Sequence, residues 1–175
     1  WTYGGSASDI YHYDGISWTV SANFSTNSDF EVVASDDIYI GGISGQIHHY
    51  DGTEWNTITV DAGNIVGIQM ESTDSGWAMD ASGKIFYYNG FGWSLQELAA
   101  PSSMNKLIVF NSSDIWTAFA QAIYHWNGVD WAEYELPSRY YIYDYFQFSS
   151  NSIWFVGGYY YWENNLDDSL IKYWD

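Results

Sequence analysis

The sequence has no cysteine and only four basic residues against 22 acidic ones, so the 175-residue chain carries a net charge of −18. Without cysteine the chain forms no disulfides and no cysteine-ligated metal site. So few basic groups exclude binding to nucleic-acid backbones and to anionic membrane surfaces. No apolar run approaches the roughly 20 residues of a transmembrane helix, so we expect no membrane insertion.

Catalytic motifs are also lacking. There is no Gly-x-Ser-x-Gly nucleophile elbow, and the acidic residues lie mostly in turns that recur along the chain. A recurring turn acid is better explained by turn chemistry than by catalysis. These turn acids are Asp14, Asp36, Asp37, Asp51, Asp74 and Asp114. We therefore expect no enzymatic activity, with a glycan-cleaving enzyme that uses two unidentified carboxylates as a remote alternative.

Aromatic residues are abundant, at 21% of the chain, and they follow a repeat. An apolar strand runs into Asp-Gly or Asn-Gly, and a Trp follows three residues after the glycine. Asp-Gly and Asn-Gly favour tight hairpin turns, and the Trp is expected to open the returning strand. The four full copies and one truncated copy span 10–18, 47–55, 85–93, 123–131 and 171–175.

Two further short strands precede each copy, which makes a repeat of four strands joined by hairpins. The turn residues Asp14, Asp51, Asn89 and Asn127 follow at intervals of 37, 38 and 38 residues. Repeats of this length with four strands indicate an all-β fold, a β-propeller of four-stranded antiparallel blades. We predict about five blades in a single domain over 1–175. The repeats cover approximately 1–28, 29–63, 64–103, 104–138 and 139–175.

The first and last repeats are incomplete. The first lacks its innermost strand and the last lacks its outermost, so the termini do not pair simply to close a ring. The chain starts without an initiator Met, inside a predicted strand, which suggests a processed chain or a fragment. Three alternatives follow: a five-bladed ring with irregular ends, part of a larger propeller, or closure with a second chain. An open sheet edge favours self-association.

The repeat resembles that of known propellers. Asp-Ile-Trp at 114–116 and Gly-x-Ile-x-His-Tyr-Asp-Gly-x-x-Trp at 45–55 are similar to repeats of bacterial secreted propellers of the sialidase or Asp-box type. Propellers of photosystem II assembly factors are relatives, and the second element also resembles seven-bladed fucose-binding bacterial lectins. Sialidase activity would imply an arginine triad, but Arg139 is the only arginine. The resemblance therefore implies a fold and no activity.

An aromatic-rich insertion of the last repeat is the predicted binding site. Its aromatic and polar side chains suit stacking on sugar rings and equally suit a protein interface. These residues are Tyr159, Tyr160, Tyr161, Trp162, Asn164, Asn165 and Asp167, and a second aromatic group precedes the last blade at Tyr140, Tyr141, Tyr143 and Tyr145. An aromatic hairpin that packs on the adjacent blade is the competing interpretation.

Histidines and acidic pairs are weaker candidates. His12, His49 and His125 occupy one repeat position, so we expect them to bond to a neighbouring blade rather than to hold a metal. His48 lies outside the pattern and is expected at the surface. Calcium could bind Asp36 and Asp37, or Asp167 and Asp168, although no known calcium-loop spacing is present. We otherwise predict no cofactor and no metal.

Together these features predict a non-enzymatic binding module, extracellular and either secreted or at the cell surface, that recognises a glycan or a protein through exposed aromatics. The alternative is a structural subunit of a self-associating extracellular assembly or filament, in which the chain would form homo-oligomers.

Overall fold

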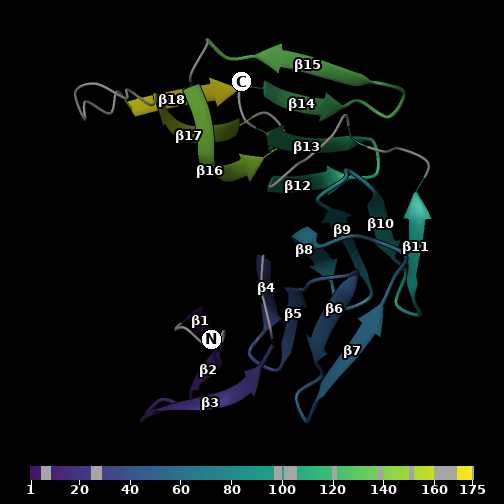
Figure 1. The fold of residues 1–175 in the computed structure, drawn as a ribbon, viewed down its shortest axis with the longest axis vertical. Coiled ribbons are helices and arrows are strands. Elements are labelled where there is room, and N and C mark those ends of the chain that lie inside the picture. The colour runs from purple at the N-terminus through teal and green to yellow at the C-terminus, as the bar shows by residue number, and fades with distance from the viewer. Residues whose placement is uncertain are drawn as a thin grey trace. The chain divides into compact units, whose positions relative to one another are not determined.

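The computed structural model of the protein describes residues 1–4, 9–24, 29–96, 100, 106–119, 122–137, 140–149, 152–159 and 169–174. These residues form antiparallel β-sheets and no helices (Figure 1). Accordingly, no helix in this part of the chain has the length and apolarity to cross a membrane. The chain divides into two compact units, Trp1–Ala99 and Ala100–Asp175, which are described separately. The single domain over 1–175 and its repeat boundaries stay predictions.

The first unit contains three sheets, each built from strands consecutive in sequence. The first blade is β1 (Thr2–Gly4), β2 (Asp9–Tyr13) and β3 (Trp18–Asn23). The second blade is β4 (Asp29–Ala34), β5 (Asp37–Gly41), β6 (Gln46–Tyr50) and β7 (Trp55–Thr59). The third blade is β8 (Ile65–Ser72), β9 (Ser75–Asp80), β10 (Ile85–Tyr88) and β11 (Trp93–Gln96).

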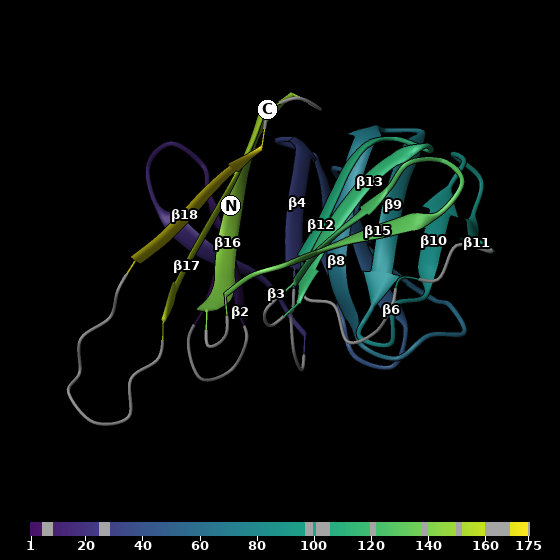
Figure 2. The same cartoon turned by 90° about the horizontal axis from the view of Figure 1, so that it is seen from above.

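The second unit contains two sheets of the same kind. The fourth blade is β12 (Lys106–Asn111), β13 (Asp114–Phe119), β14 (Ala122–Trp126) and β15 (Trp131–Glu135). The fifth blade is β16 (Tyr140–Ser149), β17 (Ser152–Tyr159) and β18 (Ser169–Trp174), which run side by side in Figure 2. The predicted all-β architecture of four-stranded antiparallel blades is confirmed, and the end blades have three strands each in the described chain.

The turns between the third and fourth strands of a repeat, here called the outer turns, are held by their Asp or Asn. They span 14–17, 51–54, 89–92 and 127–130, and each has a glycine with φ between 84° and 97°. Asp14 Oδ1 accepts the backbone N–H groups of Ile16 and Ser17 at 2.8 Å, and the other three turns repeat this arrangement. The turn is therefore encoded locally.

Strand register aligns the short first strand with the corresponding strand of the second blade. β1 pairs Tyr3 with Ile10, and β5 pairs Gly41 with Ile47. Tyr3 therefore takes the place of Gly41, and Trp1 takes the place of Tyr39. Trp1 stacks on His12 at 4.3 Å as Tyr39 stacks on His49 at 4.1 Å, which supports this alignment.

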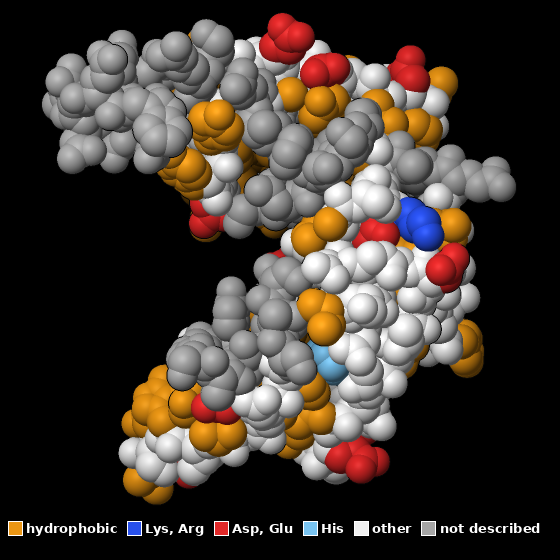
Figure 3. Space-filling view, viewed as in Figure 1, with side chains coloured by type: hydrophobic (Ala, Val, Ile, Leu, Met, Phe, Trp, Pro, Cys, Tyr) orange, Lys and Arg blue, Asp and Glu red, His pale blue; other side chains and the backbone are white. Residues whose placement is uncertain are grey.

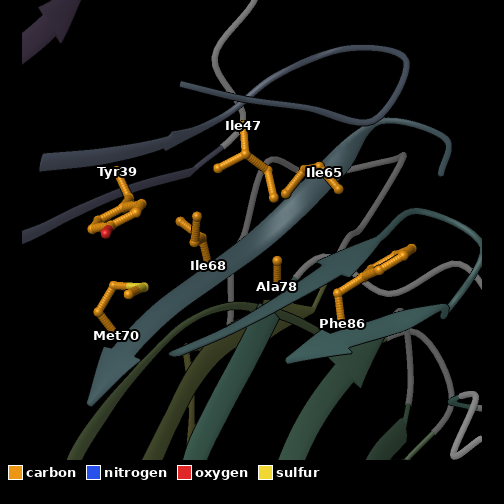
Figure 4. Packing of buried hydrophobic residues seen from close by; sticks show 7 residues of the cluster. All are labelled: Tyr39, Ile47, Ile65, Ile68, Met70, Ala78 and Phe86. Carbon is orange, nitrogen blue, oxygen red and sulfur yellow. The ribbon is translucent and has the colours of Figure 1, made fainter. Parts of the chain in front are cut away.

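The cores lie between successive blades within each unit. In the first unit, Ile10 of the first blade packs with Ile38 and Ile40 of the second. The second and third blades enclose a larger cluster, shown in Figure 4, of Tyr39, Ile47, Ile65, Ile68, Met70, Ala78 and Phe86. In the second unit, Ile108 and Trp116 of the fourth blade pack against residues of the fifth. Alternate residues of each strand thus serve opposite interfaces.

Candidate functional site

The predicted binding residues lie mostly outside the described part of the chain. Tyr159 ends β17, and its backbone pairs with Tyr140 of β16. The remaining predicted residues, Tyr160, Tyr161, Trp162, Asn164, Asn165 and Asp167, lie outside the described residues, as does the second calcium candidate, Asp168. Their binding role stays a prediction.

The aromatic residues that precede this insertion divide between the two faces of the fifth blade. Tyr145 faces the fourth blade, where its hydroxyl donates to the carbonyl of Leu107 at 2.8 Å. Tyr141 and Tyr143 face away and are 38% and 59% exposed. The same outward face presents Phe146 and Phe148, which are 59% and 72% exposed. The sequence does not indicate that these two phenylalanines are exposed, because their alternation is typical of a covered core strand.

The histidines of the repeat form structural stacks within their own blades. His49 Nε2 lies 2.8 Å from Asp37 Oδ1, and His125 Nε2 lies 2.9 Å from Asp114 Oδ1. Each acid stands at the start of the neighbouring strand of the same sheet. The prediction that these histidines bond to a neighbouring blade was therefore wrong about the partner. Their structural role stays a prediction, which the stacking of His49 on Tyr39 and of His125 on Trp116 supports.

His48 is buried, contrary to the expectation that it lies at the surface. It is 4% exposed, its Nδ1 lies 2.8 Å from Thr57 Oγ1, and its ring stacks on Phe24 of the first blade at 3.8 Å. Burial lowers the pKa of His48, so the ring is neutral at pH 7. A Cβ added to Gly42 would lie 2.8 Å from His48 Nε2, so a larger residue there would displace the His48 ring. His48 thus joins the first and second blades.

Two carboxyl groups on the innermost strand β4 connect the second blade to the third. Asp29 Oδ2 accepts the backbone N–H of Ile68 at 2.7 Å, and Glu31 accepts that of Met70. Asp29 and Glu31 are two residues apart on β4, and the residues that donate to them are two residues apart on β8. Because both carboxyl groups accept hydrogen bonds from backbone N–H groups of β8, the two acids link the first strand of the second blade to the first strand of the third.

Replacing Glu31 with glutamine is expected to raise the free energy of unfolding at pH 8 and to change it little at pH 4. Burial first, and then the nearby Asp29 carboxylate, raise the pKa of Glu31 from 4.5 to about 7. The folded state holds this proton more tightly than the unfolded state, so stability is lost as the pH rises from 4.5 through 7. Allowing for its partial exposure, we expect a gain of about 1–2 kcal/mol.

Urea denaturation of this variant at the two pH values measures the difference. Glu54→Gln, on an exposed outer turn, is the control and should have no effect at either pH. An equal effect of Glu31→Gln at pH 4 and pH 8 would contradict the assignment.

A polar joint between the second and third blades was not found from the sequence. Asp80 is 1% exposed; its Oδ1 accepts from Ser82 N, Ser82 Oγ and Lys84 N at 2.7–2.9 Å, and its Oδ2 accepts from Gly63 N at 2.8 Å. Burial alone would raise the pKa of Asp80, but these hydrogen bonds outweigh it and the pKa is lowered. In the sequence only Asp80-x-Ser82-Gly83 could indicate this buried carboxylate, and that pattern is typical of any Asx turn.

No metal site is found in the described residues. Among them, no group of three or more His, Asp or Glu side chains lies close enough to hold an ion. Asp37, half of one calcium candidate pair, is engaged with His49. Its neighbour Asp36 packs beside the outer-turn Gly52.

The outer turns present the most exposed apolar side chains of the described chain. The residue after each turn glycine is Ile16, Phe91 or Val129 in three of the four turns, with exposures of 89%, 98% and 82%. We call these three side chains the turn tips. In Figure 3, hydrophobic side chains are exposed among scattered acidic ones. The hydrogen bonds of the turn hold each tip in place. In the turn at 51–54, which has Thr53 in place of an apolar tip, the Thr53 hydroxyl and then backbone amides lower the pKa of Asp51 to about 2.

Consecutive four-stranded antiparallel sheets with aromatic residues packed between them define a β-propeller. No family model and no curated protein matches the chain. Solved structures with the same fold include YCF48 bound to D1 peptide (TM-score 0.57, 13% identity, 84% of this chain and 53% of that one). The extracellular domain of the hybrid two-component system BT4673 from B. thetaiotaomicron has a TM-score of 0.65 and 13% identity over 97% of this chain.

A computationally designed protein, Ika8, is similar at a TM-score of 0.57 and 17% identity over 85% of this chain. The chain spans 53%, 25% and 45% of the YCF48, BT4673 and Ika8 chains. At these identities the likeness shows the fold alone.

Proposed function

We propose that this chain is a non-enzymatic, extracellular recognition module that binds protein segments, each turn tip serving as a separate contact point. The observation that carries the proposal is the repetition. Single exposed apolar side chains are ordinary on any protein surface, but Ile16, Phe91 and Val129 recur at one position of the repeat and are almost fully exposed. Burial of such side chains in an interface removes apolar surface from water, which is the main favourable contribution to most protein–protein association.

The chemistry of the turn tips favours a protein over a glycan. Ile16 and Val129 are aliphatic and offer no flat ring for stacking on a sugar. Acidic residues, such as Asp14 and Asp130, stand beside the tips in the same turns, and the chain has a charge of −18. A partner segment that combines Lys or Arg with apolar residues would match both features, and its binding would weaken with salt.

The similar structures agree with this proposal without deciding it. The YCF48 structure holds a D1 peptide, and the BT4673 structure is an extracellular domain. A peptide partner and an extracellular setting for the present chain are proposals drawn from those two cases. Glycan recognition by the insertion that begins at Tyr159 is the alternative, because its side chains include tyrosines and amides.

A peptide array tests the proposal. The full chain is expected to retain peptides that contain both basic and apolar residues, and the triple variant Ile16→Ser, Phe91→Ser, Val129→Ser to bind them at least tenfold more weakly. The matched control is Thr53→Ser, in the outer turn at 51–54 that has no apolar tip; this variant keeps the hydroxyl that bonds to Asp51 Oδ1 at 2.7 Å. Unchanged peptide binding by the triple variant, or binding to a glycan array with no peptide binding, would refute the proposal.

A further inference from the structure

The second blade is joined to its two neighbours in the first unit by titratable groups of opposite kinds. Its joint with the first blade, here called the first joint, contains the His48 ring, stacked on Phe24 at 3.8 Å with an interplanar angle of 12°. Its joint with the third blade, here called the second joint, contains the Glu31 carboxyl group, which accepts the backbone N–H of Met70. A base lies in the first joint and an acid in the second, so one change in pH acts on the two joints in opposite directions.

The first joint favours a neutral His48. The ring is 4% exposed, its Nδ1 lies 2.8 Å from Thr57 Oγ1, and Gly42 lies close against its Nε2. Burial is the only effect that shifts the pKa of the ring, which is lowered from 6.5, so no carboxylate of the described chain compensates a positive charge there. As the pH falls below 6.5, protonation therefore favours an open joint in which water reaches the ring.

Other ionisable groups on the strands around His48 have partners or positions of their own. These groups are Asp9, bonded to Tyr11 and Asn23; Asp37, bonded to His49; His12, stacked on Trp1; Tyr50, bonded to the carbonyl of Gly52; Asp29 and Glu31, bonded to β8; and Asp51 and Glu54, in the exposed outer turn. Among the described residues, His48 is therefore the group through which acid acts on the first joint.

The second joint favours a protonated Glu31. Burial first, and then the Asp29 carboxylate, raise the pKa of Glu31 from 4.5 to about 7. Asp29 Oδ2 accepts the N–H of Ile68 at 2.7 Å, so two carboxyl groups meet one strand, and protonation of Glu31 relieves their repulsion. The other ionisable groups beside them are Tyr39, whose ring lies in the core, and Glu71, which accepts from Ser75 Oγ at 2.6 Å. A fall in pH through 7 therefore strengthens this joint.

We propose that pH sets which joint of the second blade opens more readily: acid weakens the first joint through His48 and strengthens the second joint through Glu31. Both changes take place between pH 7.5 and 5.5, because an exposed imidazole gains its proton near pH 6.5 and Glu31 gains its proton near pH 7. The two effects partly cancel in the stability of the whole unit, so the proposal concerns the two joints and is tested on each of them separately.

Hydrogen exchange of the full chain, measured by mass spectrometry at pH 7.5 and 5.5 and corrected for the intrinsic pH dependence of exchange, tests the proposal. On acidification, protection of residues 9–24 in the first blade should fall by up to about tenfold, the limit set by an imidazole that titrates at 6.5 when the joint is open. Protection of β8, at 65–72, should rise by on the order of tenfold, because Glu31 holds its proton more tightly in the closed joint.

Variants of the two groups separate the joints. His48→Phe keeps a ring that stacks on Phe24 but does not titrate, so the response of the first blade to acid should be lost and that of β8 kept. Glu31→Gln should do the reverse. His48→Gln is a second variant of the first joint with the same expected result, and circular dichroism checks that all three fold. A first-blade response that is absent from the wild type or persists in both His48 variants, or two segments that respond in the same direction, would overturn the proposal.

Discussion

Replacement of Asp80 by alanine is expected to lower the free energy of unfolding by about 3–4 kcal/mol. The substitution removes the acceptor of four hydrogen bonds at once, and one of its donors, Gly63 N, belongs to the loop that leads into the third blade. Because Asp80 is 1% exposed, water cannot readily replace the carboxylate. The variant should therefore loosen the joint between the second and third blades as well as its own turn.

Urea denaturation of Asp80→Ala measures this effect, and Asp61→Ala is the matched control. Asp61 lies in the same joint, but its carboxylate is fully exposed and only approaches Lys84 Nζ at 3.7 Å, so its loss should have little effect on stability. The pKa of Asp80 is lowered from 3.8 in the folded chain, so its stabilisation is present above pH 3.8 and is lost as the pH falls further. A difference between wild type and Asp80→Ala that persists unchanged at pH 2 would contradict this account.

Replacement of Asp114 by alanine is the second large expected effect, at about 2–4 kcal/mol. Asp114 Oδ1 accepts from Trp116 Nε1 at 2.8 Å and lies 2.9 Å from His125 Nε2, and Trp116 is 1% exposed. The substitution takes the acceptor from both groups in the core between the fourth and fifth blades. Stacking of His125 on Trp116 at 3.9 Å would remain.

The second blade provides an internal control for this prediction. Asp37 bonds to His49 in the same geometry, but its neighbour is Tyr39 and no indole donates to it. Asp37→Ala should therefore cost only about 1 kcal/mol. Thermal unfolding of the two variants side by side makes the comparison, and equal losses of stability would show that the indole hydrogen bond contributes nothing.

Features that depend on a few adjacent residues were predictable. An Asp or Asn followed by glycine builds the outer turn with its own side chain, and a Trp opens the next strand in all four full copies, as at Trp18 and Trp131. The period of the turns then gave the blades, because a sheet that cannot bury its own faces must stack on its copies. The candidate site was only partly predictable: Tyr141 and Tyr143 are exposed as an accessible aromatic group requires, whereas Tyr145 is turned inward.

Features that join one blade to the next were not predictable. Asp80 and Gly63 are 17 residues apart, and only the packing of two sheets makes the carboxylate of one the acceptor for the other. His48 is buried because Phe24 of the first blade lies against it, which nothing in its own strand indicates. Phe146 and Ile108 share a repeat position and an apolar character, yet they are 59% and 0% exposed, a difference that neither strand indicates by itself.

The sequence by itself therefore determined the hairpins, their turns and the repetition, because those rest on interactions within about ten residues. The tertiary structure decided which polar groups and which aromatic side chains are buried, because burial depends on neighbouring blades that are distant in sequence.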